Sequence, residues 1–99
     1  MLYAIIWDDV DDSLELRLSV REQHLIRVQD LIDEGRIVIG GPFPRVDAED
    51  PGPAGFSGSL IVAEFASEDE ARKWINEDPY ARVGLFKNLT VKPFVKVVP

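Results

Sequence analysis

Residues 12–35 read DSLELRLSVREQHLIRVQDLIDEG, and this stretch decides the fold. Its apolar residues recur at spacings of three, four and seven, which is the periodicity of an amphipathic helix. They are Leu14, Leu18, Leu25, Val28, Leu31 and Ile32. Acidic residues at the start suit the positive end of the helix dipole, and Gly35 follows the last periodic residue as a C-terminal cap. The pattern predicts a helix from about Asp12 to Glu34.

The segments on either side of this helix predict strands. Leu2–Trp7 is a continuous apolar run that ends at the acidic turn Asp8–Asp12, and its length favours a buried strand. Arg36–Ile39 predicts a second strand, which we expect to end in a turn at Gly40–Pro44, GGPFP. Val46–Phe56 is rich in Pro, Gly and acidic residues and predicts a loop.

The second half of the chain repeats the alternation of strand and helix. Ser59–Phe65, SLIVAEF, predicts the third strand. Ser67–Glu70 is a capping box that opens a second helix, expected to reach about Asn76. Asp78-Pro79-Tyr80 ends that helix and begins a short extra turn that ends near Gly84. Leu85–Val98 predicts the last strand, in which Pro93 indicates an edge position or a bulge.

The resulting order is βαββαβ, which is the α+β, ferredoxin-like arrangement in a single domain spanning residues 1–99. Helices cover only one face of such a sheet, so the other face must be buried in another way. The strands are apolar enough on both faces to predict a homodimer through sheet-to-sheet packing.

Composition narrows the range of partners. The net charge is −7, and residues 1–50 carry all of this excess with twelve acids against five bases. An acidic chain repels phosphate backbones and anionic lipid surfaces, so we expect neither nucleic acid nor a membrane as partner. The chain has no cysteine, which excludes disulfides, thiolate metal sites and a cysteine nucleophile. The N-terminal apolar run is too short for a signal peptide, and we expect a cytoplasmic protein.

The long helix carries the main chemical clue. At about 100° per residue, the only histidine, His24, lies within the apolar arc, with Arg17 about 20° and Arg21 about 60° away. Burying such groups without partners is unfavourable, so a cleft between this helix and the sheet would explain them. It would be a cationic pocket suited to a small anion or a phenolate. Alternatively, His24 is a hydrogen-bonded core residue and the arginines extend past the apolar stripe into water.

Other motifs are weaker by themselves. Asp78-Pro79-Tyr80 is common turn chemistry, although an aspartate beside a histidine would fix its tautomer and raise its basicity. Gly40-Gly41-Pro42 permits close approach of the backbone to a ligand, or it is a plain turn. Ser57 and Ser59 lack the motif of a nucleophilic serine. The spacing of histidine and carboxylates matches no metal site, and nothing requires a cofactor.

Taken together, these pieces resemble the YciI-like family over essentially the whole chain. The residues that carry the resemblance are Arg17–Leu25, Glu34–Arg36, Gly40–Pro42, Ser59 onward, Asp78–Tyr80, Gly84 and Val91–Phe94. The resemblance implies a ferredoxin-like fold that forms a dimeric α+β barrel. It also implies an active site that holds His24 and Asp78, with Arg21, Tyr80 and the Gly41-Pro42 segment in the same cleft. Related members include a dehydrochlorinase of a chlorinated hydroxyquinol.

Two functions remain open from the sequence. In the first, the protein is an enzyme of lyase or hydrolase type, in which His24 acts as acid or base on a small phenolic, enolic or anionic molecule. Asp78 then orients the imidazole, and Arg17 or Arg21 stabilises developing negative charge. In the second, the same pocket belongs to a non-catalytic dimeric module that binds a small anionic metabolite.

Overall fold

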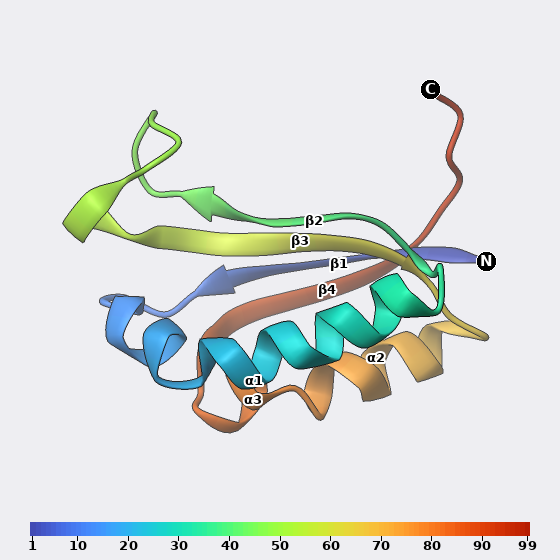
Figure 1. Cartoon of the computed structure of the whole chain (residues 1–99), viewed down its shortest axis with the longest axis horizontal. Coiled ribbons are helices and arrows are strands. Elements are labelled where there is room, and N and C mark those ends of the chain that lie inside the picture. The colour runs from blue at the N-terminus through green and yellow to red at the C-terminus, as the bar shows by residue number, and fades with distance from the viewer.

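The computed structural model describes all 99 residues and confirms the ferredoxin-like α+β fold. The elements along the chain are β1 (Leu2–Asp9), α1 (Leu14–Asp33), β2 (Ile37–Pro44), the 3-10 turn η1 (Gly52–Ala54), β3 (Phe56–Glu64), α2 (Glu68–Asn76), α3 (Pro79–Arg82) and β4 (Phe86–Phe94). The four strands form one antiparallel sheet in the order β2-β3-β1-β4. All helices lie on one face of this sheet, and the C-terminal tail extends away from it on the other side (Figure 1).

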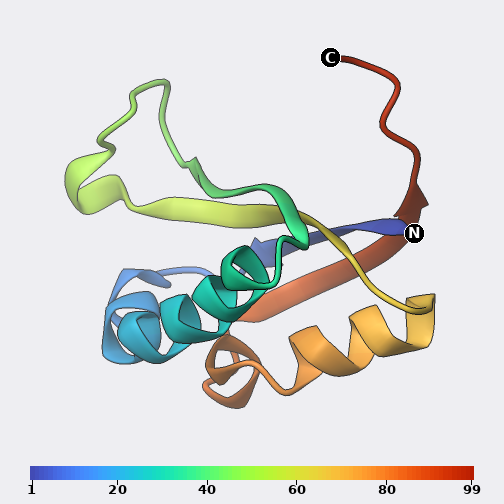
Figure 2. The same ribbon diagram turned by 45° about the vertical axis from the view of Figure 1, so that its right-hand side comes forward.

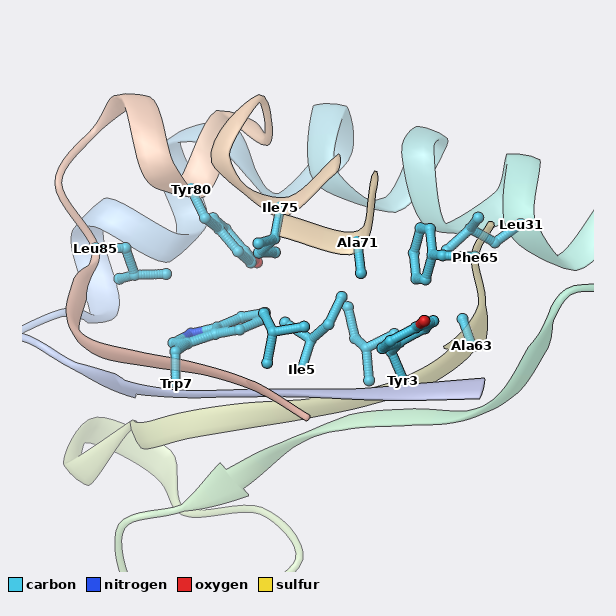
Figure 3. Packing of buried hydrophobic residues seen from close by; sticks show 12 residues of the cluster. Tyr3, Ile5, Trp7, Leu31, Ala63, Phe65, Ala71, Ile75, Tyr80 and Leu85 are labelled. Carbon is cyan, nitrogen blue, oxygen red and sulfur yellow. The ribbon is translucent and has the colours of Figure 1, made fainter. Parts of the chain in front are cut away.

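The core lies between the sheet and the helices, and Figure 3 shows its side chains pointing into this layer. Tyr3, Ile5 and Trp7 alternate along β1 and face the helices, as the two-residue period of a strand requires. They meet Ala71 and Ile75 from α2. Ser67 caps α2 as expected, because its Oγ accepts a hydrogen bond from the Glu70 N–H at 3.1 Å. α2 therefore packs on β1 and β4, while α1 packs against α3 (Figure 2).

The expected turn at Gly40–Pro44 is wrong, because these residues continue β2. Gly40 pairs with Ile61 and Pro42 with Ser59 on the neighbouring strand β3. β2 is an edge strand, so a proline that lacks an N–H is tolerated there. These residues are therefore not a loop. They form a hydrogen-bonded strand on the opposite side of a cleft from α1.

Other boundaries differ by a few residues. β3 begins at Phe56, earlier than expected, because its first residues pair with β1 and β2. β4 ends at Phe94, and the exposed residues 95–99 follow it. Pro93 lies in the edge strand β4, as predicted.

The buried stripe of α1 is narrower than its apolar periodicity suggests. Arg17, His24 and Leu31 are the buried residues, spaced by seven, whereas Leu18 and Leu25 are exposed. The helix rests on α3 and stands off from β2 and β3, so its apolar flank is left beside a cleft. No helix combines the length and the apolar character needed to cross a membrane.

Candidate active site

A cleft of about 330 Å³ separates α1 from β2 and β3. Its lining has an apolar part and a polar part, and the polar part includes side chains that the sequence pattern predicted. The apolar part is lined by Leu25, Val28, Ile32, Ile37, Ile39 and Ile61. The polar part is lined by Arg17, Arg21, His24, Ser59 and Tyr80, with Trp7 beside them. A cleft of this size fits a single small ring system rather than a large cofactor.

His24 and Asp78 form a buried pair. The imidazole Nδ1 lies 3.0 Å and 2.9 Å from the two carboxylate oxygens of Asp78, whose side chain is completely buried. Because carboxylate oxygens only accept, Nδ1 carries the hydrogen in this contact. Every fully buried side-chain nitrogen and oxygen has a partner, whereas Nε2 of His24 bonds no protein group. Nε2 is therefore open to the cleft that His24 lines.

Local structure explains the position of Asp78. It is the N-cap of α3, and its Oδ1 accepts a hydrogen bond from the Tyr80 N–H at 2.9 Å. Arg27 donates from Nη1 to Oδ2 at 3.0 Å. The turn chemistry and the histidine contact are thus both present, and the cap holds the carboxylate in place for the imidazole.

Tyr80 stacks on the imidazole of His24, with ring centroids 4.1 Å apart and planes 22° from parallel. Burial raises the pKa of Tyr80 above 10.0, and Asp78 adds to this, while Arg17 and Arg21 act in the opposite direction. The phenol is consequently neutral at physiological pH. It can donate a hydrogen bond to a ligand but does not serve as a base.

Arg17 does not extend into water, as one alternative proposed, but is buried in an ion pair with Asp9. Its Nε and Nη2 bond the two carboxylate oxygens of Asp9, at 2.5 Å and 2.9 Å. Nη2 also donates to the Gly58 carbonyl and the Ser59 Oγ, at 2.9 Å and 3.0 Å. Asp9 further accepts hydrogen bonds from Trp7 Nε1 and Ser13 Oγ. Most of the donor capacity of Arg17 is therefore used within the protein.

Arg21 behaves differently, because it is exposed and takes part in no ion pair. It lines the same cleft one helical turn after Arg17. Gly41 and Pro42 form part of the opposite wall, on β2. All seven candidate residues thus gather at this cleft, although Asp78 reaches it only through His24 and Tyr80.

Asp9 was missed, and Ser59 was considered only as a nucleophile, although the sequence carried a signal for both. Asp9 continues the alternation of Tyr3, Ile5 and Trp7, so it should face the helices rather than form a turn. Ser59 likewise alternates with Ile61. Arg27 had no comparable signal, since its contact with Asp78 joins residues 51 positions apart in the chain.

The arrangement can move protons. A neutral imidazole that is hydrogen-bonded at Nδ1 presents the Nε2 lone pair to a ligand, and the carboxylate stabilises the imidazolium that forms. Arg21 can pair with a negative oxygen. Nowhere in the structure do three or more His, Asp or Glu side chains come together as metal ligands.

Comparison with known proteins gives a consistent family. The family model of the YCII-related domain matches residues 1–95. Protein YciI of Escherichia coli O6:H1 is 54% identical over 97 residues, covering 98% of this chain and 99% of its own. A protein of Emericella nidulans named for a cluster that makes a benzaldehyde derivative is 36% identical over 77 residues, covering 74% of this chain and 76% of its own. A 5-chloro-2-hydroxyhydroquinone dehydrochlorinase of Burkholderia phenoliruptrix, solved with 2,5-dihydroxybenzoquinone, superposes with a TM-score of 0.84 at 27% identity, over 96% of this chain and 94% of that one.

Proposed function

Because the chain belongs to the family of proteins with a YCII-related domain, we propose that it is an enzyme that moves a proton on a small phenolic or enolic ring. His24 Nε2 takes the proton in this reaction. The electron pair that is left on the substrate moves to a ring oxygen, and the proton later leaves His24 for the product or for water. The reaction class is general acid–base catalysis.

One observation carries this proposal. The imidazole is tied at Nδ1 to a fully buried carboxylate, while Nε2 remains unbonded in a cleft with apolar walls. A histidine with a purely structural role has no need of an open nitrogen beside a ring-sized space. The stacked Tyr80 holds the imidazole plane from one side. This contact limits rotation of the ring and so favours a constant direction of Nε2 for proton transfer.

The substrate class is supported by the cleft and by two similar proteins. Aliphatic side chains form one part of the cleft, which suits the faces of a planar ring. The Burkholderia enzyme acts on a chlorinated hydroxyhydroquinone, and the Emericella protein is named for a benzaldehyde derivative. A ring that carries an oxygen anion would place that oxygen at Arg21, since Arg17 is already paired with Asp9.

We further propose that the protein works as a homodimer, packed sheet to sheet. The open face of the sheet is apolar, because Ala4 and Ile6 on β1 pair with Val62 and Leu60 on β3 at positions that point away from the helices. Phe43 on β2 and Phe94 on β4 each remain 40% exposed on this side of the sheet. A second copy would bury this face by a two-fold packing.

Binding and turnover of 2,5-dihydroxybenzoquinone and unsubstituted hydroxyhydroquinone test the function. Thermal unfolding of wild type and His24→Asn is followed with each compound, and the compound is then examined by mass spectrometry. We expect both compounds to raise the melting temperature of the wild type. We expect the compound that is a substrate to be converted into a product of different mass or into an isomer. His24→Asn should bind without conversion, because the amide fits the site but cannot exchange a proton.

The other outcomes are equally clear. Binding to the wild type without any chemical change, across a panel of phenols and enols, would contradict the enzyme and favour a module that binds a small anionic metabolite. A lower melting temperature of His24→Asn with no response of either protein to any ligand would show that His24 is structural. Arg82→Gln serves as control, since Arg82 is exposed and lies outside the cleft.

A further inference from the structure

Two side chains, rather than one, donate hydrogen bonds to the Asp78 carboxylate. Its Oδ2 accepts hydrogen bonds from His24 Nδ1 at 2.9 Å and from Arg27 Nη1 at 3.0 Å. Its Oδ1 is bonded by the Tyr80 backbone N–H. The carboxylate is completely buried, so its negative charge is shared between the imidazole and the guanidinium with little screening by water.

Arg27 reaches this carboxylate from behind the cleft. It lies three residues beyond His24 on α1, and its guanidinium stands 4.5 Å above the ring of Trp74 on α2. Its side chain is 23% exposed and belongs to a shallow hollow on the outer surface, which it shares with Glu77 and Arg82. Arg27 does not line the cleft, so it can act on a bound ligand only through Asp78.

We propose that Arg27 is a positioning residue that sets the charge state of the His24–Asp78 pair. A carboxylate that faced His24 alone would favour the imidazolium, which cannot accept a proton. The guanidinium offsets part of that negative charge, which disfavours the imidazolium and favours the neutral imidazole that can accept a proton. The inference rests on the proposed function for its meaning in catalysis, but the electrostatic coupling can be measured without any substrate.

Other titratable groups surround the imidazole, and none of them replaces Arg27. Those that face it are Tyr80 from α3, Arg17 and Arg21 from α1, and Asp9 from β1 through its pair with Arg17. Tyr80 is neutral, and Arg17 is paired with Asp9. Arg21 is exposed to solvent, which weakens its field. Of the arginines Arg17, Arg21 and Arg27, only Arg27 is hydrogen-bonded to Asp78.

Because His24 is the only histidine, nuclear magnetic resonance of the imidazole titrates it without ambiguity. The titration is recorded for wild type, Arg27→Gln and Arg27→Lys. Arg82→Gln is the matched control, since it removes the same charge from the same hollow without touching the Asp78 carboxylate. We expect Arg27→Gln to raise the titration midpoint of His24 by about one pH unit. Arg27→Lys should restore most of the wild-type midpoint, and Arg82→Gln should change it little.

Several results would overturn the proposal. These are an unchanged or lowered midpoint in Arg27→Gln, equal shifts in Arg27→Gln and Arg82→Gln, or equal shifts in Arg27→Gln and Arg27→Lys. If Arg27→Gln does not fold, Arg27→Met keeps the stem over Trp74 and gives the same test. Absence of turnover with every phenol would contradict the proposed function. The inference about Arg27 would still be decided by the titration, which needs no substrate.

Discussion

Tyr80 lies among the charged side chains Arg17, Arg21 and Asp78, and its protonation limits the chemistry of the cleft. Desolvation by burial is the largest influence, and it raises the pKa of the phenol above 10.0 in spite of the two arginines. A phenol that stays neutral cannot compete with His24 for a substrate proton. It can donate a hydrogen bond, and in the proposed reaction the role of base is left to His24.

The same shift predicts a loss of stability at alkaline pH. In the unfolded chain the phenol ionises near pH 10, whereas in the folded protein it does so at a higher pH. The contribution of Tyr80 is therefore complete below about pH 10 and is lost as the pH rises through the folded-state pKa, at up to about 1.4 kcal/mol per pH unit. Tyr80→Phe should show a flatter fall in the free energy of unfolding over this range, measured by urea denaturation.

Tyr3→Phe is the matched control for this measurement, since Tyr3 is the only other tyrosine. It leaves Tyr80 in place and should keep the alkaline fall of the wild type. Parallel curves for wild type and Tyr80→Phe would contradict the role of Tyr80.

How much of the site the sequence could predict depends on the distance over which each contact acts. Arg17, Arg21 and His24 share one helix, so their common face followed from periodicity alone. Asp78 was assigned only through the family resemblance, because no local pattern shows that it lies beside His24. The contact of Arg27 with Asp78 also requires the packing of α1 on α3, which periodicity does not describe.

At the scale of elements, the pair of Asp9 and Arg17 joins the end of β1 to the first turns of α1. Both side chains are almost fully buried, and they are supported by Ser13 and Ser59. Removal of one partner leaves the other charge buried without compensation, which costs about 3–5 kcal/mol. Asp9→Ala should therefore lower the free energy of unfolding by this order, as measured by urea denaturation.

The double variant Asp9→Ala/Arg17→Met provides the control. It removes both charges and should recover a large part of the loss, since buried ion pairs are often replaceable by apolar side chains. A double variant that is no more stable than Asp9→Ala would contradict an account based on uncompensated charge.

Strand β2 forms one wall of the cleft, and Gly40, which has no side chain, leaves space at that wall. A Cβ added at Gly40 would lie 3.5 Å from Ile37 Cδ1 and 3.7 Å from Ile61 Cγ1, both of which are cleft residues. These are ordinary contacts, and the backbone of Gly40 has no positive φ, so alanine should be tolerated. Gly40→Leu should fill the space and weaken binding of 2,5-dihydroxybenzoquinone by about tenfold or more, measured by calorimetry.

Gly40→Ala tests whether any such loss comes from volume rather than from the glycine itself. It should bind the compound nearly as well as the wild type. Equal losses in Gly40→Ala and Gly40→Leu would instead indicate a change in the strand. The expected turn at this place was wrong because glycine and proline mark both turns and edge strands, and only the pairing with β3 distinguishes the two.

For the whole molecule, the βαββαβ order was predictable because each element has its own local sequence pattern. The capping box, the apolar runs and the helical period each involve residues that are close together in the chain. The extent of α1 burial was not predictable, since it depends on how far the helix stands off from the sheet. The open face of the sheet is where local patterns and packing meet, because its apolar residues are plain in the sequence but no helix of the same chain covers them (Figure 1).

Ile6 tests that open face directly. It lies partly buried on β1, between Leu60 of β3 and Thr90 of β4. Ile6→Arg would place a charge at the middle of a sheet-to-sheet interface, where it has no partner. We expect the wild type to sediment at twice the 11.1 kDa of the chain, and Ile6→Arg at the mass of one chain with similar helical content.

Ile26→Arg is the matched control, because it makes the same change at an exposed position on α1. It should remain dimeric. A wild type that sediments as a monomer, or an Ile6→Arg protein that stays dimeric, would mean that the apolar open face is not the surface through which two copies associate.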